Sequence, residues 1–182
     1  MKKIFVINGS ASRNSSNQKL IEKFADMTKD IFSLTVFNDL KTLPHFDPEL
    51  AVKDTPKVIS EFRHNIDTAD GVVICTPEYV FSIPSGLKNA MEWCVSTTVF
   101  AGKLTGLITA SANGEKGHEE LQLIMKTLMA EFTPDTTLLI QGIKGKINEQ
   151  GDITDSKTKY SLVKFIGAFK QLIHSVCKNA MI

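Results

Sequence analysis

Cysteine is scarce in this sequence. Only Cys75, Cys94 and Cys177 occur among its 182 residues, they lie far apart, and none belongs to a CxxC pair. None has a metal-ligand spacing with any of the four histidines. This pattern argues against a disulfide framework and against a zinc site of cysteine and histidine. It fits a reducing compartment, and we expect a cytoplasmic protein without a bound metal.

An excess of charge is also missing, because 21 Lys and Arg residues face 20 Asp and Glu residues. Without a basic excess, the chain has no broad field to attract nucleic acid or an anionic membrane. The first apolar run, residues 4–7, is too short for a signal peptide. No apolar stretch approaches the roughly 18 residues of a membrane-spanning helix. We therefore expect neither a nucleic-acid nor a membrane partner, and a small molecule instead.

Markers of disorder and of several domains are absent as well. The hydrophobic content of 42% and the charged content of 23% are ordinary for a globular protein. A chain of this length fits one core, and it contains no internal repeat. The polar segment 144–156 is predicted to be a loop and not a linker. Residues 1–182 are thus expected to form a single domain.

Short apolar runs predict five β-strands. The runs at residues 4–7 and 71–75 are continuous instead of alternating, as in parallel strands buried on both faces. The predicted strands comprise residues 2–8, 31–37, 71–75, 104–110 and 136–140.

Amphipathic helices are predicted between these strands and after the last one. One begins at Thr55-Pro56, with the threonine hydroxyl as cap, and the next begins at Pro84. The irregular segment 38–54 precedes the first of these two, and we expect it to be functional. The apolar residues predicted to face the core are Leu20, Ile21, Phe24 and Met27; Val58, Ile59, Phe62 and Ile66; Leu87, Ala90, Met91 and Cys94; Leu121, Ile124, Met125 and Leu128; and Leu162, Phe165, Phe169, Leu172 and Val176.

Strands that alternate with helices predict an α/β fold with a doubly wound parallel sheet, helices on both faces and strand order 2-1-3-4-5. In such sheets ligands bind beyond the carboxyl ends of the strands, where the winding direction reverses. That point lies between the first and third strands. The loops after Asn8, Cys75 and Ala110 are therefore the expected site.

The first of these loops is rich in hydrogen-bond donors and leads into a helix. Free N–H groups at a helix N-terminus favour an anion, and an arginine adds a full charge. The loop lacks GxGxxG and GxxxxGK[ST], which favours a mononucleotide such as FMN over a dinucleotide or ATP. The simpler alternative is a helix cap inside a solvated loop. The candidate phosphate-binding residues are Ser10, Ser12, Arg13, Ser15, Ser16 and Asn17.

The second loop contains two prolines, which stiffen a turn that presents aromatic and backbone polar groups. A rigid turn of this kind suits the face and polar edge of an isoalloxazine ring. For the lone carboxylate, Glu78, a structural or solvated role is more common than an acid/base role. For Tyr79 and Phe81, burial in the core is an alternative to contact with a flavin. The candidate flavin-binding residues are Pro77, Glu78, Tyr79, Val80 and Phe81.

The third loop has small residues that allow the backbone to approach a planar ligand. Ser111, Asn113 and Gly114 are the candidates here, beside the pyrimidine side of the flavin. His118, at the start of the following helix, is expected to be a surface residue because no orienting partner is evident.

Two stretches resemble the NADPH-dependent FMN reductase family, which includes quinone, chromate and azo-dye reductases of the flavodoxin-like superfamily. The family pattern GSxRxxSxN is similar to residues 9–17. The pattern TPEYNxSxPGxLKNxxDW is similar to residues 76–93, with identity at TPEY, Ser82, Pro84, LKN and Trp93. In this chain, Ser12 stands at the family's arginine position with Arg13 following, and Val80 replaces an asparagine. Ser85-Gly86 and Glu92 are further departures.

This resemblance implies a flavodoxin-like three-layer sandwich that holds FMN non-covalently. The implied electron donor is NADPH or NADH, and the implied acceptors are quinones, free flavin, azo compounds or similar small molecules. FMN itself carries the hydride, so no catalytic side chain is expected. Family members form dimers or tetramers with the flavin near the interface, which implies that Phe81, Trp93, Phe100 and the His45-Phe46 loop lie there.

Two other functions stay open. A flavodoxin-like electron carrier shares the fold, although such carriers are typically acidic and have a TxTGxT first loop. A non-enzymatic flavin-binding regulator is the third possibility, and Val80 is the one residue that favours it.

Overall fold

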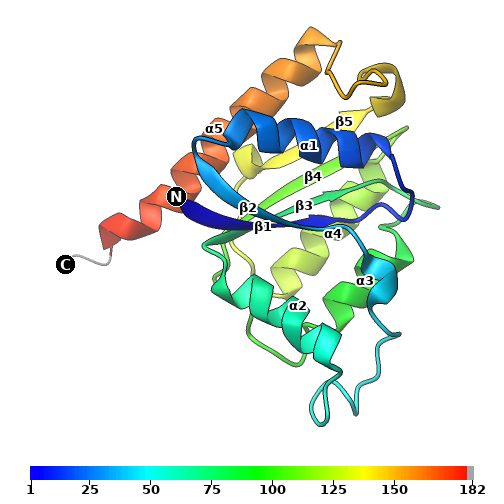
Figure 1. The fold of residues 1–182 in the computed structure, drawn as a ribbon, viewed down its shortest axis with the longest axis vertical. Coiled ribbons are helices and arrows are strands. Elements are labelled where there is room, and N and C mark those ends of the chain that lie inside the picture. Colours follow the sequence, from blue (N-terminus) through cyan, green and yellow to red (C-terminus); the bar gives the residue numbers. More distant parts are fainter. Residues whose placement is uncertain (180–182) are drawn as a thin grey trace.

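The computed structural model describes residues 1–179, and the side chains of residues 1–175. Val176 and Cys177 therefore lie outside the described side chains. The chain forms one five-stranded parallel sheet with the order β2-β1-β3-β4-β5 (Figure 1), as predicted. The strands are β1 (Lys2–Asn8), β2 (Phe32–Phe37), β3 (Gly71–Thr76), β4 (Thr105–Ser111) and β5 (Thr137–Gln141).

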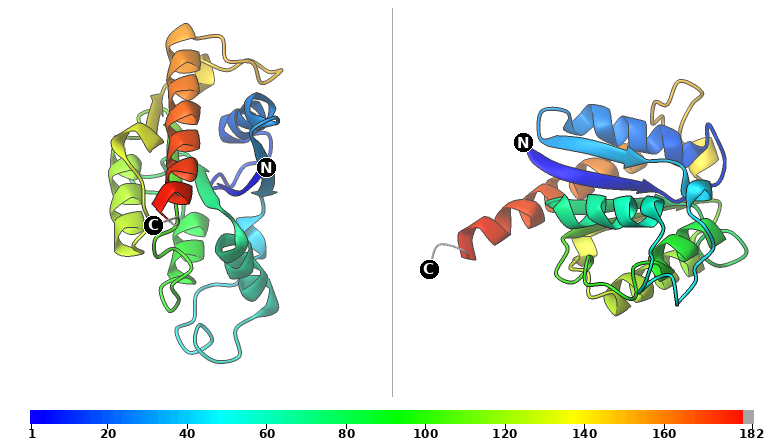
Figure 2. Two further views of the ribbon diagram at one scale, coloured as in Figure 1. Left: turned by 90° about the vertical axis from the view of Figure 1, so that its left-hand side faces the viewer. Right: turned by 60° about the horizontal axis from the view of Figure 1, so that its bottom comes forward.

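Helices cover both faces of this sheet and give the predicted three layers. Figure 1 shows helices above and below the sheet, and the turned views of Figure 2 show the same layers. On the first face are α1 (Ser16–Thr28) and α5 (Ser156–Asn179). On the second are α2 (Lys57–Thr68), α3 (Ser85–Glu92) and α4 (Glu115–Thr127).

The alternation of side chains along β1 shows why both faces must be covered. Ile4 and Val6 pack in the cluster under α1 and α5, whereas Phe5 and Ile7 pack in the cluster under α2, α3 and α4. All four side chains are at most 1% exposed. Burying apolar area on both faces, at about 25 cal/mol per Å², is what favours this layered arrangement over an open sheet.

The prediction that the Thr55 hydroxyl caps the next helix is wrong. Helix α2 begins at Lys57 after Pro56, and no side chain caps it. The Thr55 hydroxyl instead donates to the Leu50 carbonyl at 2.9 Å. The proline fixes its own backbone for the helix start, so the hydroxyl is free to close the preceding loop.

The irregular segment 38–54 contains one short 3₁₀ helix, η1 (Leu40–Thr42). After η1, the segment is hydrogen-bonded to residues in and just after α3. Trp93 Nε1 donates to the Pro44 carbonyl at 2.8 Å, and Asn89 Nδ2 donates to the same carbonyl at 2.9 Å. The Asn89 side-chain oxygen accepts from Phe46 N–H at 2.7 Å. The Asn and Trp of the signature stretch thus hold the chain's own loop, which a sequence pattern alone does not reveal.

These contacts correct the expectation that Trp93 and Phe100 belong to a subunit interface. Trp93 is 0% exposed and Phe100 is 1% exposed, both inside the cluster under α2, α3 and α4. Arg63 adds a further tie, because its Nε donates to the Trp93 carbonyl at 2.8 Å. A partner could reach either aromatic ring only if this core opened.

Candidate functional site

The loops after β1, β3 and β4 meet at the carboxyl edge of the sheet, as the switch-point rule predicts. Around them lie two cavities that share the 10–14 loop and Tyr79. We call the larger one, of about 860 Å³, cavity A; its other walls are residues 15–17, Pro77, residues 110–112 and parts of the 142–149 segment. A volume of this size is within the range of sites for drug-sized ligands and cofactors.

The second cavity, cavity B, has a volume of about 620 Å³. It lies on the other side of the 10–14 loop, between α1 and the turn that follows β2. Residues 38–41 and 84–86 form its outer walls. Residues 38–41 belong to the irregular segment that the sequence predicts to be functional, although the sequence does not predict a second cavity.

Nine of the fourteen candidate site residues line cavity A, and five do not. The five outside it are held in turns or point to solvent. Those that line cavity A are Ser10, Ser12, Arg13, Ser15, Ser16, Asn17, Pro77, Tyr79 and Ser111; those that do not are Glu78, Val80, Phe81, Asn113 and Gly114.

The first loop presents backbone donors without partners. The Ser15 hydroxyl accepts from Gln18 N–H at 3.1 Å and so caps α1, as the simpler alternative has it. That cap leaves the N–H groups of Ala11, Arg13, Asn14, Ser16 and Asn17 without an acceptor in the described part of the chain.

These free donors fit the phosphate of FMN. The exposed Arg13 guanidinium also has no acidic partner among the described residues. Four of the residues that carry these N–H groups, Arg13, Asn14, Ser16 and Asn17, line cavity A at the start of α1. Such N–H groups, a helix N-terminus and a cation are the donor set that a phosphate requires. The residues present therefore fit a mononucleotide phosphate at this place.

Asn17 lines the cavity, but its side chain is already engaged. Its Nδ2 donates to the Ala110 carbonyl at 3.0 Å, and its side-chain oxygen accepts from the Cys75 thiol at 3.4 Å. Burial raises the pKa of Cys75, so this thiol keeps its proton. Asn17 thus joins the start of α1 to the ends of β3 and β4, and its backbone N–H is the part left for a ligand.

The second loop closes in a tight turn with its apolar residues outside. Tyr79 N–H donates to the Ser82 carbonyl at 2.9 Å, and Ser82 N–H donates back at 3.0 Å. Val80 and Phe81 occupy the two central positions with φ of 51° and 59°, the pattern of a type I′ turn. They are 93% and 73% exposed, so the alternative of a buried Phe81 is wrong.

Two carboxylates hold this turn against α4. Glu78 Oε1 accepts from Gly114 N–H at 3.2 Å, and Glu78 Oε2 accepts from Gly117 N–H at 2.8 Å. From the other side, Glu120 accepts from the Ser82 hydroxyl at 2.5 Å and from Ile83 N–H at 3.1 Å. Both carboxylates are occupied by neutral donors, so the structural role of Glu78 is the observed one.

Replacing Val80 by asparagine, the residue of the family pattern, is expected to stabilise the protein. A β-branched residue with positive φ is strained by roughly 1 to 2 kcal/mol, whereas asparagine tolerates this region. Urea unfolding should therefore show a gain of about 1 kcal/mol. Val95→Asn is the matched control, because Val95 is also exposed but lacks a positive φ. Equal changes in both variants would contradict a strained turn.

The third loop contributes one wall of cavity A and the start of α4. The Ser111 hydroxyl donates to the Glu78 carbonyl at 3.4 Å, which links the second and third loops. Gly114, with φ of 89°, precedes α4, where an added Cβ would lie 2.9 Å from Leu139. The Asn113 side-chain oxygen accepts from Gln141 Nε2 at 2.8 Å, outside the cavity.

The expectation that His118 is a surface residue is wrong. The side chain is half-buried against the sheet, and its Nδ1 lies 2.9 Å from the Thr109 hydroxyl. Burial lowers the pKa of His118, and the nearby Glu119 carboxylate opposes that shift. Thr109 lies on β4, nine positions before His118 on α4, and the turn between these two elements brings the side chains together.

His118 should make folding stability depend on pH. Its pKa is lower in the folded than in the unfolded chain, so the unfolded state binds the proton first as the pH falls. Stability is therefore complete above the unfolded pKa of about 6.5 and declines as the pH drops below it. Urea unfolding of His118→Gln should show a flatter decline over this window than the parent protein. An unchanged slope would contradict the burial effect.

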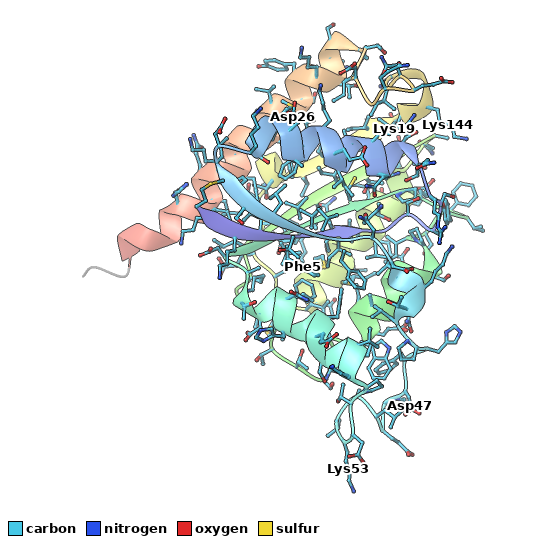
Figure 3. All side chains as sticks on the ribbon, viewed as in Figure 1. Phe5, Lys19, Asp26, Asp47, Lys53 and Lys144 are labelled. Atoms are coloured by element: carbon cyan, nitrogen blue, oxygen red, sulfur yellow. The ribbon has the colours of Figure 1, made fainter. Side chains whose placement is uncertain are left out.

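The sequence reasoning missed the segment after β5, which it treated as an ordinary loop. Lys144 and Asn148 from this segment line cavity A. Lys19 on α1 donates to the Asn148 carbonyl at 3.3 Å, and Lys23 pairs with Asp152 at 3.0 Å. Lys19 and Lys144 lie at the same end of the molecule (Figure 3). The sheet topology could have predicted this wall, because the carboxyl end of β5 lies at the same edge as those of the other parallel strands.

Two other kinds of feature are absent from the described residues. Among them, no three His, Cys, Asp or Glu side chains are grouped as metal ligands would be. No helix within this part of the chain has the length and apolarity to cross a membrane.

The known proteins that are similar to this chain include quinone reductases. The chain is 30% identical over 174 residues to a 2-hydroxy-1,4-benzoquinone reductase from Burkholderia sp, covering 92% of this chain and 93% of that one. It is 29% identical to an NADPH:quinone oxidoreductase from Arabidopsis thaliana, with 88% and 86% covered. Among solved structures, the flavoenzyme NAD(P)H:(acceptor) oxidoreductase FerB from Paracoccus denitrificans superposes with a TM-score of 0.81 at 25% identity, covering 95% and 97%.

The family pattern itself extends over most of the chain. The NADPH-dependent FMN reductase pattern matches residues 2–142, from β1 through the last residue before η3 (Ile143–Gly145). This range includes the donor-rich first loop, the tethered second loop and the third loop. The sheet order, the donor set of cavity A and this match agree, and the chain belongs to the NADPH-dependent FMN reductase family.

Proposed function

We propose that this protein binds FMN in cavity A and transfers hydride from NADH or NADPH through it to a quinone. Free flavin and azo compounds are further acceptors of the same kind, small and planar. The observation that carries the proposal is the convergence of unpaired N–H groups and Arg13 on a cavity of about 860 Å³. The quinone reductases among the similar proteins support the choice of acceptor.

In this proposal the phosphate lies against the first loop. Ser10, Ser12, Ser15 and Ser16 supply hydroxyl or backbone donors, and Arg13 supplies charge. The isoalloxazine lies against Pro77, Tyr79 and Ser111, where the cavity walls are stiff. The tethers to Glu78 and Glu120 support this assignment, because they fix the second loop before any ligand binds.

FMN supplies the redox chemistry when bound, since its ring accepts hydride from nicotinamide and gives electrons to an acceptor. The chain's residues then have to bind, orient and exclude water. The Glu78 carboxylate is occupied by two N–H groups, and His118 is paired with Thr109. Neither residue lines cavity A, and we propose that no side chain transfers a proton to the acceptor.

An assay of the purified protein separates the reductase from its alternatives. The released cofactor is identified, and NADH and NADPH are each tested with benzoquinone, FMN and an azo dye. A reductase turns over benzoquinone with at least one nicotinamide. A carrier protein holds flavin but shows no turnover, and an empty fold holds none, so either result would overturn the proposal.

We further propose a cytoplasmic homodimer or homotetramer. The exposed apolar tip formed by Val80 and Phe81 supports an interface, because it stands beside the cavity and no described residue covers it. Light scattering of the purified protein tests this. The mass of a single chain at micromolar concentration would contradict it.

A further inference from the structure

Cavity B is separate from the place proposed for the flavin phosphate. The N–H groups of Ser16 and Asn17 belong to cavity A, whereas cavity B meets α1 along its side, at Gln18 and Glu22. The two cavities share Tyr79 and the 10–14 loop as a common wall. A molecule that extends out of cavity B therefore reaches the edge of cavity A directly.

The floor of cavity B is a fixed chain of amide groups. Asn8, which is 3% exposed, donates from Nδ2 to Gln18 Oε1 at 2.8 Å. Gln18 Nε2 in turn donates to Glu22 Oε1 at 2.8 Å. The Asn8 oxygen accepts from Ser10 N–H at 3.0 Å, and Asn8 Nδ2 also lies 3.2 Å from the Asn38 oxygen. Asn8 is buried and Gln18 half-buried, and their hydrogen bonds to each other and to their neighbours give this floor one defined shape.

The rim of cavity B carries charged side chains that have no ion-pair partner among the described residues. Asp39, Glu22, Lys41 and Arg13 line it, and none of the four forms an ion pair with another described residue, although Glu22 accepts a hydrogen bond from Gln18. The Asp39 carboxylate also accepts no hydrogen bond within residues 1–175. Its backbone is nevertheless fixed, because the Asp39 carbonyl accepts from the N–H and the hydroxyl of Thr42.

This set of groups matches the chemistry of an adenosine diphosphate ribose. A carboxylate accepts hydrogen bonds from ribose hydroxyls, and cations balance a diphosphate. In dinucleotide-binding α/β folds an acidic side chain takes the 2′-hydroxyl of the adenosine ribose, whereas an arginine accommodates a 2′-phosphate. Asp39 follows the second strand and faces the cavity, where a 2′-phosphate would meet a like charge.

We propose that cavity B binds the adenosine half of the nicotinamide donor, with Asp39 accepting hydrogen bonds from its ribose, and that this carboxylate favours NADH over NADPH. The proposal rests on the proposed function in one respect, that a nicotinamide is the electron donor. Lys41 attracts the diphosphate, while Arg13, in the wall shared by the two cavities, serves the flavin phosphate. Tyr79, which belongs to both cavities, stands where the donor passes from cavity B to the flavin site.

Calorimetric titration of the FMN-loaded protein with ADP-ribose and with 2′-phospho-ADP-ribose tests this without turnover. We expect ADP-ribose to bind more tightly than its 2′-phosphate. In Asp39→Asn that preference should fall about tenfold, since one like charge near the phosphate and one charged acceptor are lost together. Asp30→Asn is the matched control, because the exposed Asp30 precedes the same strand at the opposite edge of the sheet. Its preference should equal that of the parent protein.

Lys41→Glu gives a second reading that does not depend on Asp39. It should weaken both ligands about tenfold or more, because both carry the diphosphate. An unchanged preference in Asp39→Asn, equal binding of the two ligands to the parent protein, or displacement of FMN by ADP-ribose would each overturn the inference. Reduction of the bound flavin by NADH is measured in parallel. If NADH still reduces the bound flavin while any of those results is found, the inference about cavity B is wrong but the proposed function stands.

Discussion

Replacing Gly9 by alanine is expected to destabilise the protein by about 3 kcal/mol, at the upper end of the usual range for overpacking. A Cβ at this position would lie 2.6 Å from Thr76 Cβ and 3.0 Å from Leu87 Cδ2. Thr76 cannot give way, because it is fully buried and its hydroxyl donates to the Pro77 carbonyl at 3.0 Å. Gly9 N–H also donates to the Cys75 carbonyl at 2.8 Å. Urea unfolding measures the loss.

The same substitution should weaken FMN binding, because Gly9 joins β1 to the first loop at the end of β3. Gly167→Ala is the matched control: Gly167 lies inside α5, and an added Cβ meets nothing within 4 Å. Alanine in an exposed helix interior should raise stability by roughly 0.5 to 1 kcal/mol. If Gly9→Ala unfolded at the same urea concentration as the parent protein, the close packing of the first loop on β3 would be refuted.

Replacing Arg13 by alanine should weaken FMN by about 2 kcal/mol, or roughly thirtyfold, the usual size of a charge-assisted hydrogen bond. Riboflavin has the same ring but no phosphate, so its affinity should hardly change. Titration of the apoprotein with each flavin, followed by fluorescence quenching, measures both values. The ratio of the two affinities reports the phosphate contact independently of any general loss of folding.

Lys53→Ala is the control for charge in this experiment. Lys53 is exposed at the tip of the 38–54 segment, far from Lys19 and Lys144 at the carboxyl edge (Figure 3). Its loss should leave both affinities unchanged. Equal weakening of FMN and riboflavin in Arg13→Ala would mean that Arg13 shapes the loop instead of binding the phosphate.

Much of the fold follows from local sequence pattern. Each of the five strands was predicted to within one residue at both ends, because continuous apolar runs such as 4–7 have only one way to be buried on both faces. The strand order and the site at the carboxyl edge then follow from the handedness of the crossovers. The cap at Thr55 was wrong, because Pro56 sets the helix start without it.

The details of the site depend on pairings between distant residues, which no local pattern encodes. Asn17 was expected to face a ligand, but Ala110 and Cys75 occupy its side chain. Likewise His118 meets Thr109, and the segment after β5 becomes a cavity wall through its contact with Lys19. At Val80, by contrast, the sequence pattern already identified an unusual position, because the family has an asparagine there. The positive φ of Val80 explains why asparagine is favoured.

Anaerobic reduction of the purified protein tests the central claim most directly. FMN bound in cavity A should lose its visible absorbance within the mixing experiment when NADH or NADPH is added, and should regain it when benzoquinone follows. The Arg13→Ala protein, reconstituted with excess FMN, should bleach to the same extent. Bound FMN that stays oxidised with both nicotinamides would contradict the account.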